Sequence, residues 1–274
     1  VFKGSGLSSS AALEILLGNI FNSLFHDGKC TPVQLAQIGQ YAENVYFGKP
    51  SGLLDQMGSS MGGMVTIDFQ DNDHPVVEKI DFDFASAGHA LCIIDSGADH
   101  ADLTDEYAAV PGELKKVCAH FGKSVLREVP EADFYAALPA LRRECGDRAV
   151  LRAIHIYDEN RRVQEQIAAL RRNDFPAFLA QVRLSGLSSW RYLQNVVPAG
   201  YKEHQEVAVA LAAAERLLNG RGACRVHGGG FAGTIQAFVP LDMLEGFKSG
   251  MEQVLGDGRC HVLSVRSVGG VRLV

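Results

Sequence analysis

A glycine- and serine-rich segment that runs directly into a helix-forming sequence most constrains the fold of this chain. Residues 4–10 read GSGLSSS and residues 11–17 read AALEILL. The first turn of a helix carries backbone N–H groups without intrahelical partners and a partial positive charge. Glycines let the backbone approach a ligand closely, and the serine hydroxyls add donors. The segment therefore predicts an anion site suited to a phosphate, with an ordinary helix N-cap in a polar loop as the alternative.

The length and charge of the chain limit the classes of protein to which it can belong. It has 274 residues, enough for one large domain or two ordinary ones, and a net charge of −6. No block or stripe of basic residues occurs in the sequence, so nucleic acid is not an expected partner. A mildly acidic protein can still hold a local positive pocket for phosphates.

The six cysteines are widely spaced and form no CxxC pair. This spacing supports neither a zinc site nor a disulfide scaffold, and we expect thiols in a reducing cytoplasm. The sequence contains no apolar run of membrane-spanning length and no signal peptide, so we expect a cytoplasmic protein without a membrane partner. Because the first residue is Val1 rather than methionine, we interpret the chain as a fragment.

Periodicity predicts a mixed α+β protein rather than a regular alternation of strands and helices. A helix over 8–26 is apolar at positions 13, 16, 17, 20, 21 and 24. A second helix opens with a capping box at Thr31 and Gln34, and its expected buried stripe is Leu35, Ile38, Ala42 and Val45. Residues 64–69 and 76–82 predict a hairpin, and residues 90–95 a buried strand. We expect further helices over 104–121, 131–144, 147–172, 174–185, 201–219 and 241–255, and late strands over 234–239 and 261–265.

Two carboxylates that follow the first helix are candidates for chemistry. Asp55 lies just after the turn at 50–52, where it could orient a sugar hydroxyl and accept its proton during phosphoryl transfer. Its alternative role is to cap the helix that starts there. Glu43 lies twelve residues earlier and could hold Mg²⁺ together with the Ser10 hydroxyl and phosphate oxygens. Its alternative is a solvated helix glutamate.

Three successive glycines, Gly228, Gly229 and Gly230, precede a predicted strand. They permit close backbone approach or positive φ angles. They could form a second wall beneath bound phosphates or a simple tight turn.

Taken together and in this order, these segments resemble the GHMP kinase family, most closely its members that act on galactose. The resemblance covers essentially the whole chain. Its motifs are GSGLSSSAALE at 4–14, AENVYFGKPSGLLDQMGSSMGG at 42–63, IIDSGADHADLTDEY at 93–107 and RVHGGGFAGTIQAFV at 225–239. Ala232 departs from the glycine that the family usually has there.

The resemblance implies an ATP-dependent kinase that phosphorylates the C1 hydroxyl of galactose. It makes Asp55 the catalytic carboxylate, Ser10 and Glu43 the Mg²⁺ ligands, and Gly52 and Tyr107 parts of the sugar pocket together with Asp55. Its implied ATP-binding residues are Gly4, Ser5, Gly6, Leu7, Ser8, Ser9, Ser10, Ala11, Gly228, Gly229 and Gly230. The implied fold has an N-terminal domain, here residues 1–84, and a ferredoxin-like C-terminal domain, here residues 85–274.

One feature of the resembling kinases has no counterpart in the sequence. They begin with an arginine and a GEHTD-like sugar signature, and no such string occurs here. That arginine is expected to stabilise charge on the transferred phosphoryl group. We therefore expect these 274 residues alone to be inactive or nearly so.

Three other functions remain open at the level of the sequence. One is another GHMP sugar kinase, such as an N-acetylhexosamine kinase. Another is a non-catalytic sensor of galactose and ATP, although the intact serine loop favours an enzyme. The third is a plain nucleotide-binding module. The sequence does not indicate an oligomeric state.

Overall fold

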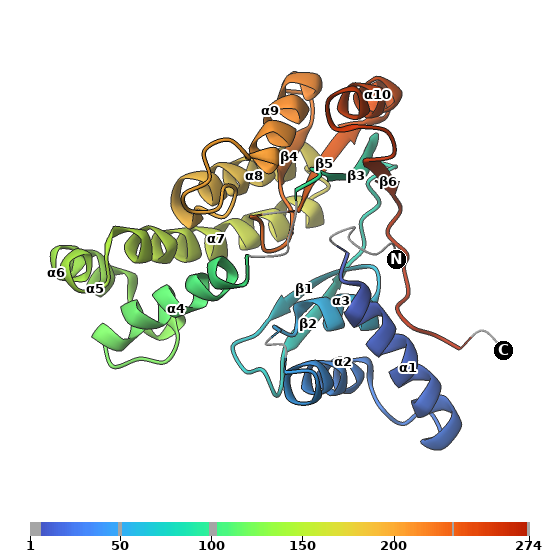
Figure 1. Ribbon diagram of the computed structural model, residues 1–274. Helices are drawn as coiled ribbons and strands as arrows, with labels where there is room; N and C mark the ends of the chain where they lie inside the picture. Colours follow the sequence, from blue (N-terminus) through green and yellow to red (C-terminus); the bar gives the residue numbers. More distant parts are fainter. Residues whose placement is uncertain (1–6, 49–50, 99–102, 232, 273–274) are drawn as a thin grey trace. The chain divides into compact units, whose positions relative to one another are not determined.

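The computed structural model describes residues 7–48, 51–98, 103–231 and 233–272 (Figure 1). The chain forms two compact units, one of residues 1–83 with 264–274 and one of residues 84–263. The boundary expected between residues 84 and 85 assigns the C-terminal segment to the second domain, whereas here that segment belongs to the first unit. A backbone hydrogen bond helps to hold it there, because the Gly63 N–H donates to the Arg266 carbonyl at 2.7 Å. An added Cβ on Gly62 would also lie 2.1 Å from the Val268 carbonyl carbon.

The first unit combines three α-helices with a hairpin. Its elements are α1 (Ser9–Phe25), α2 (Pro32–Tyr41), a π-helical turn η1 (Ala42–Tyr46), α3 (Leu54–Met61), β1 (Met64–Asp68) and β2 (Val76–Ile80). The capping box at Thr31 is confirmed: its side chain accepts from the Gln34 N–H while the Gln34 side chain accepts from the Thr31 N–H. The hairpin is confirmed too, with Met64 opposite Ile80 and Asp68 opposite Val76.

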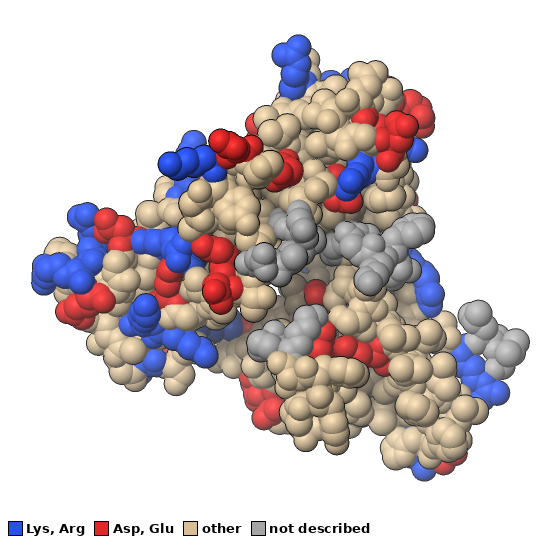
Figure 2. Space-filling model, in the orientation of Figure 1, with Lys and Arg blue, Asp and Glu red and all other residues tan. Residues whose placement is uncertain are grey.

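Burial in this unit differs from the stripe expected for the second helix. In the second helix Leu35 is buried, but Ile38 and Val45 are 53% and 57% exposed, so that part of the stripe is wrong. The helix changes to π-helical geometry after Tyr41, and its buried face is formed by Leu35, Ala36 and Gly39. In α1 all six expected apolar positions are exposed, and the buried residues are Ala11 and Ile15. The surface over α1 and α2 carries few charged side chains on the face drawn in Figure 2.

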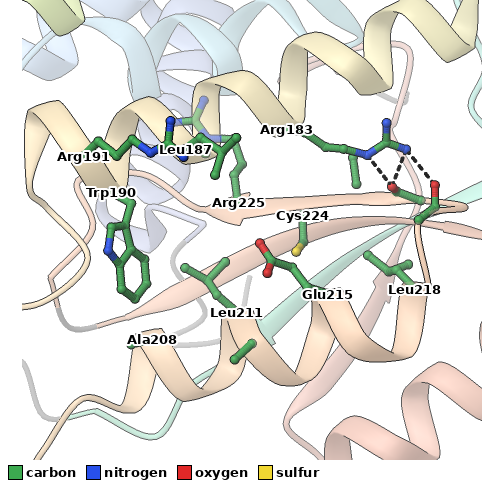
Figure 3. Close-up of a pocket in the computed structure, with 15 residues that line it drawn as sticks. Arg183, Leu187, Trp190, Arg191, Ala208, Leu211, Glu215, Leu218, Cys224 and Arg225 are labelled. Carbon is green, nitrogen blue, oxygen red and sulfur yellow. Dashed lines mark hydrogen bonds between the residues drawn. The ribbon is translucent and has the colours of Figure 1, made fainter.

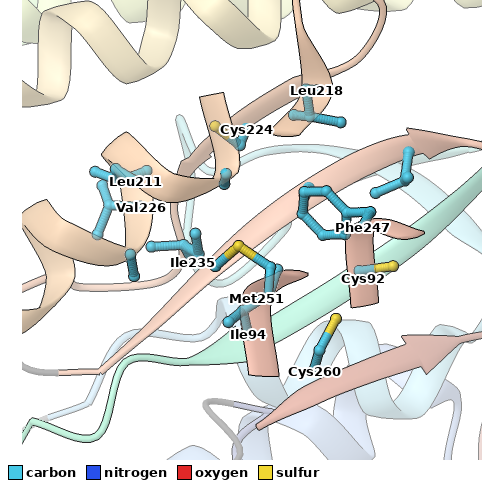
Figure 4. Close-up of a cluster of buried hydrophobic side chains, with 14 of the residues drawn as sticks. Cys92, Ile94, Leu211, Leu218, Cys224, Val226, Ile235, Phe247, Met251 and Cys260 are labelled. Atoms are coloured by element: carbon cyan, nitrogen blue, oxygen red, sulfur yellow. The ribbon is translucent and has the colours of Figure 1, made fainter. Parts of the chain in front are cut away.

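A four-stranded antiparallel sheet organises the second unit. Its order is β4 (Ala223–Val226), β5 (Thr234–Pro240), β3 (His89–Asp95) and β6 (Cys260–Leu263). Helices α9 (Glu206–Leu218) and α10 (Leu244–Leu255) cover one face (Figure 1), and Figure 4 shows the buried cluster between them and the strands. The other face receives α8 (Phe175–Ser188), whose Phe178 ring lies 5.2 Å from that of Phe238 on β5.

The remaining helices of the second unit form a second core. They are α4 (Thr104–His120), α5 (Glu131–Ala136), α6 (Leu138–Glu144) and α7 (Asp147–Arg171), with short 3₁₀ or π turns at Leu126–Glu128, Ser189–Leu193 and Leu241–Met243. The single helix expected over 131–144 is two helices, because Pro139 lacks an N–H and starts a new first turn. Basic and acidic side chains alternate over this part of the surface in Figure 2, and ion pairs such as Arg161–Glu131 join them.

The α+β class is confirmed, although β4 was not expected. Among the described residues, no helix combines the length and apolar character that crossing a membrane requires. All six cysteines are free thiols, and four of them are buried.

Candidate functional site

The start of α1 is the first part of the predicted site. Residues 4–6 lie outside the described residues, so the structure describes the predicted loop from Leu7 onward. Ser8 has φ +50° and ψ +69°, a left-handed conformation that is uncommon for a residue with a side chain. It occupies the N-cap position but makes no side-chain capping hydrogen bond. The alternative of an ordinary serine cap is therefore not what the structure has, because the Ser8 side chain does not take up the N–H groups of the first turn.

Glu43 is buried rather than solvated. Glu43 lies in the π-helical turn η1 and is 4% exposed. Its Oε2 accepts a hydrogen bond from Gln56 Nε2 at 2.9 Å. The same Gln56 nitrogen donates to Glu14 Oε2 at 3.1 Å. One buried amide from α3 therefore bridges carboxylates from η1 and α1. Glutamates are rarely buried without a structural or functional partner, which distinguishes Glu43 from an ordinary surface residue.

Glu14 is a member of this cluster that the sequence analysis missed. It lies one helical turn after Ser10, so the two side chains share a face of α1. The close approach of α2 depends on Gly39, where an added Cβ would lie 3.2 Å from Glu14 Oε2. Because Glu14 shares the Gln56 amide with Glu43, the face of α1 that carries Ser10 is directed toward the Glu43 cluster.

The donors in this cluster are of the type that Mg²⁺ prefers. They are carboxylate oxygens, with the Ser10 hydroxyl on the same helix face, and the buried Gln56 Oε1 has no hydrogen-bond partner among the described residues. No group of three or more His, Cys, Asp or Glu side chains is placed to hold a metal ion within the described parts of the chain. A magnesium ion here would need ligand oxygens to complete its coordination, as is usual for Mg²⁺ bound with nucleotide phosphates.

Asp55 lies in the first turn of α3, directly before Gln56. It is exposed and forms no hydrogen bond or ion pair with any described residue. The N-cap position of α3 belongs to Leu53, and no side chain caps this helix. Asp55 is therefore not the helix cap that the alternative interpretation expected. Gly52, in the preceding turn, is also exposed and has no atom within 4 Å of where a Cβ would lie.

The glycine turn and Tyr107 lie together in the second unit. Gly228 and Gly230 have φ angles of +61° and +82°, which favour glycine. The Tyr107 hydroxyl donates to the Gly230 carbonyl at 2.8 Å, and its ring stands edge-on to Phe231 at 5.2 Å. A Cβ on Gly229 would lie 2.8 Å from Tyr107 Cε1. The backbone conformation therefore favours glycine at positions 228 and 230, and packing against Tyr107 leaves no room for a side chain at Gly229.

Asn195 holds the glycine turn from the other side, and sequence reasoning did not find it. It is 2% exposed, its Nδ2 donates to the Gly229 carbonyl at 3.1 Å, and its carbonyl accepts from the Phe231 N–H. The π-helical turn Ser189–Leu193, just before Asn195, is held by the fully buried Arg152. Its Nε donates to the Leu193 carbonyl at 3.1 Å. Arg152 is paired with Glu113 at 2.9 Å. No local motif marks either residue.

Within each unit the structure gives some of the predicted residues defined neighbours. In the first it brings Glu43 beside Gln56 and Glu14, with Asp55 next along the chain. In the second it brings Tyr107 against Gly229 and Gly230.

Comparison with known proteins shows which proteins this chain is similar to. Residues 1–63 match the family described as GHMP kinases N terminal domain, which spans the start of α1, Glu43 and Asp55. The galactokinase of Streptomyces coelicolor is 34% identical over 240 residues, and that of Mycobacterium tuberculosis (strain H37Rv) is 33% identical over 247 residues. The chain belongs to the GHMP kinase family.

These matches cover 86% and 87% of the chain but 58% and 62% of the two relatives. The chain thus spans about 60% of the length of the curated relatives that it matches.

The fold of this GHMP kinase chain has solved counterparts. The Lactococcus lactis galactokinase complexed with galactose superposes with a TM-score of 0.77 at 24% identity, over 98% of this chain and 68% of that one. The L. major mevalonate kinase in complex with R-mevalonate gives a TM-score of 0.60 at 14% identity, over 95% and 66%. The predicted family and fold class are both confirmed.

Proposed function

We propose that this chain carries the phosphate-binding and catalytic residues of a galactokinase, which transfers the γ-phosphoryl group of ATP to the C1 hydroxyl of galactose. The curated relatives named galactokinase support the reaction. The observation that carries the proposal is the buried Glu43–Gln56–Glu14 cluster against α1, with the exposed, unpaired Asp55 beside it in sequence.

Phosphoryl transfer passes through a loose transition state, so the protein contributes mostly positioning and charge stabilisation. In this proposal the N–H groups in the first turn of α1 bind the β- and γ-phosphates of ATP. They are suited to this because Ser8 leaves them without a side-chain cap. The serine hydroxyls of the loop add further donors.

Glu43 and Ser10 would hold Mg²⁺, with Glu14 and Gln56 keeping the Glu43 carboxylate in place. Bound Mg²⁺ would neutralise the negative charge that develops on the β- and γ-phosphate oxygens. The Gln56 amide fixes the Glu43 carboxylate through a hydrogen bond to its Oε2, and this carboxylate would supply an oxygen ligand to the ion.

Asp55 would orient the C1 hydroxyl of galactose in line with the γ-phosphorus and accept its proton. The hydroxyl oxygen forms the new P–O bond while the bond to the ADP oxygen breaks, and the proton moves to the carboxylate. The lack of a hydrogen-bond partner among the described residues leaves both oxygens of Asp55 free to do this.

The other predicted residues complete the proposed site. Gly52 gives the sugar close access to the backbone beside Asp55, because no side chain fills that space. Tyr107 donates its hydroxyl proton to the Gly230 carbonyl. In this proposal its phenolic oxygen accepts a hydrogen bond from a sugar hydroxyl. The Gly228–Gly230 turn would support the phosphates. We place the enzyme in the cytoplasm, in keeping with its six free thiols, and expect no macromolecular partner for the reaction.

The test is a turnover assay on two proteins. One is the 274-residue chain, and the other is a chimera that adds the portion of the Streptomyces coelicolor galactokinase without a counterpart here. We expect the chimera to form galactose 1-phosphate from ATP, and the chain alone to be roughly a thousandfold slower or worse. A panel that includes glucose and N-acetylgalactosamine separates galactokinase from other GHMP sugar kinases.

Asp55→Asn in the chimera should lower turnover by at least about a hundredfold without weakening ATP binding, because a general base typically contributes that much. The matched control is Asp81→Asn, an exposed aspartate of the same unit. ATP binding without phosphorylation of any sugar would instead support a sensor. Equal turnover by the Asp55 and Asp81 variants would refute the proposed role of Asp55.

A further inference from the structure

A cavity of about 540 Å³ lies within the second unit, and no predicted site residue lines it. It is enclosed by α8 and the π turn that follows it, by α9, and by strand β4 (Figure 3). Its volume falls in the range of small-molecule sites, about 300–1,000 Å³. The proposed kinase reaction does not account for it, and of the sequence motifs only the first residue of the 225–239 segment, Arg225, contributes to its wall.

Most of the cavity wall is apolar. Its larger apolar residues are Leu187, Trp190, Ala208, Leu211, Leu218 and Cys224. Trp190 is 46% exposed and stands at one end of the cavity with Leu211 and Ala208 nearby, as Figure 3 shows. A partly exposed tryptophan beside an aliphatic floor is suited to a flat, apolar molecule.

The charged part of the wall is unbalanced, with Arg183, Arg191 and Arg225 against the single carboxylate of Glu215. Arg183 donates to the Gly222 and Gly220 carbonyls at 2.7 and 3.1 Å, which are neutral acceptors and do not cancel its charge. Arg191 forms no ion pair with any described residue.

The positive charge of Arg225 is only partly compensated, since its Nε and Nη2 donate to neutral acceptors, the Val226 carbonyl at 3.1 Å and Ser189 Oγ at 3.4 Å. Its nearest carboxylate is Glu159, with Nη1 at 3.4 Å from Oε1, while Glu159 Oε2 accepts from Arg162 Nε at 2.8 Å. Two guanidinium groups thus share one carboxylate. Burial lowers the pKa of Arg225, the change expected for a cation that its surroundings do not fully stabilise.

We propose that this cavity binds a small organic carboxylate, with its charged end at Arg191 and Arg225 and its aromatic or aliphatic body against Trp190 and Leu211. Both arginines lie at the end of the cavity that holds Trp190 (Figure 3). A guanidinium group matches the planar geometry of a carboxylate, and the apolar wall excludes a small inorganic anion or a free sugar as the best-fitting ligand.

Trp190 is the only tryptophan in the chain, so its fluorescence reports directly on this cavity. The experiment titrates the 274-residue chain with 3-phenylpropionate and with its uncharged amide, and isothermal titration calorimetry repeats both. We expect saturable binding of the carboxylate with a dissociation constant of about 1 mM or tighter, and at least about tenfold weaker binding of the amide. Equal affinities for the two compounds, or no saturable binding of the carboxylate, would overturn the proposal.

Three variants locate the binding. Arg191→Gln should weaken carboxylate binding at least about fivefold, as loss of a charge-assisted hydrogen bond predicts. Arg216→Gln, on α9 but outside the cavity wall, should leave it unchanged. Ala208→Phe should fill the cavity and abolish binding of both compounds while circular dichroism and thermal unfolding stay as in the parent chain. Unaltered binding in Arg191→Gln or in a folded Ala208→Phe protein would place the ligand elsewhere and refute the assignment.

Discussion

Gln56 illustrates how one side chain can hold a site together. It is 1% exposed, and its amide nitrogen donates to carboxylates from two other elements. Asp55 and Gln56 are neighbours in sequence, but the first faces solvent and the second faces the core. The first turn of α3 thus presents the candidate catalytic carboxylate of Asp55 to solvent and the Gln56 amide, which supports Glu43, to the core.

Replacing Gln56 by methionine should destabilise the chain by about 2 kcal/mol, because it leaves the Glu14 and Glu43 carboxylates without their shared donor. Urea unfolding followed by circular dichroism measures this. Gln70→Met, at an exposed position after the first hairpin strand, should change the free energy of unfolding by less than about 0.5 kcal/mol. A Gln56→Met protein as stable as the Gln70 variant would contradict the bridging role.

His155 makes the second unit sensitive to acid. It is 4% exposed, its Nδ1 lies 2.9 Å from Ser188 Oγ, and burial lowers its pKa from 6.5 to about 4. Glu159 opposes this change, while Arg162 and Arg225 add to it. Above pH 6.5 the histidine is neutral in both the folded and the unfolded chain, so it does not make stability depend on pH there.

Between pH 6.5 and about 4 the unfolded chain binds a proton that the folded chain does not. Stability should therefore fall as the pH is lowered through this window, by about 3 kcal/mol from this group. In His155→Asn that component of the pH dependence should disappear, whereas His26→Asn, at an exposed position, should keep it. Parallel stability–pH curves for the His155 variant and the parent chain would show that the pKa is not lowered by folding.

At the scale of elements, the glycine turn between β4 and β5 shows two different reasons for glycine. Gly228 and Gly230 both have positive φ angles, but a Cβ on Gly228 would meet no atom within 4 Å. A Cβ on Gly230 would lie 2.1 Å from the Asn195 carbonyl oxygen. Glycine at 228 is therefore needed only for the positive φ angle. Glycine at 230 is needed for the positive φ angle and because no side chain fits against Asn195.

Gly228→Ala should therefore cost about 1–2 kcal/mol, the penalty of the left-handed conformation alone. Gly230→Ala should cost at least about 2 kcal/mol more, because the turn must also move away from Asn195. Thermal unfolding of both variants gives the comparison. Equal losses of stability in the two variants would mean that the Asn195 backbone can move away from an added Cβ without an energetic penalty.

Local patterns predicted the starts of elements better than their buried faces. Thr31 and Gln34 fixed the beginning of α2 because a capping box is a local hydrogen-bond pattern. The buried stripe of the second helix was predicted only in part, with Leu35 buried but Ile38 and Val45 exposed. Burial depends on distant partners: Gly39 faces Glu14 and Gln56, and neither contact has a local signal. The exposed apolar residues of α1 keep the periodicity of a helix while contributing little to the core described here.

At the scale of the whole molecule, the order and spacing of the motifs identified the family, and the periodicity of apolar residues indicated the α+β class. The sequence could not predict that residues 264–274 return to the first unit, because that contact joins backbone segments about 200 residues apart. It offered Glu43 and Asp55 as candidates but did not indicate their neighbours in the fold or the roles of Glu14, Asn195 and Arg152. Those three act through tertiary contacts to other side chains and carbonyls.

The most direct test of the central claim is hydrogen exchange of the 274-residue chain with and without Mg²⁺ and a non-hydrolysable ATP analogue, measured by mass spectrometry. If α1 and the Glu43 cluster bind the phosphates, the nucleotide should slow exchange in peptides covering residues 7–17 and 42–57, and Glu43→Gln should weaken this protection. Mg²⁺ alone serves as the control. Protection confined to other segments, or none at nucleotide concentrations that saturate binding, would contradict the account.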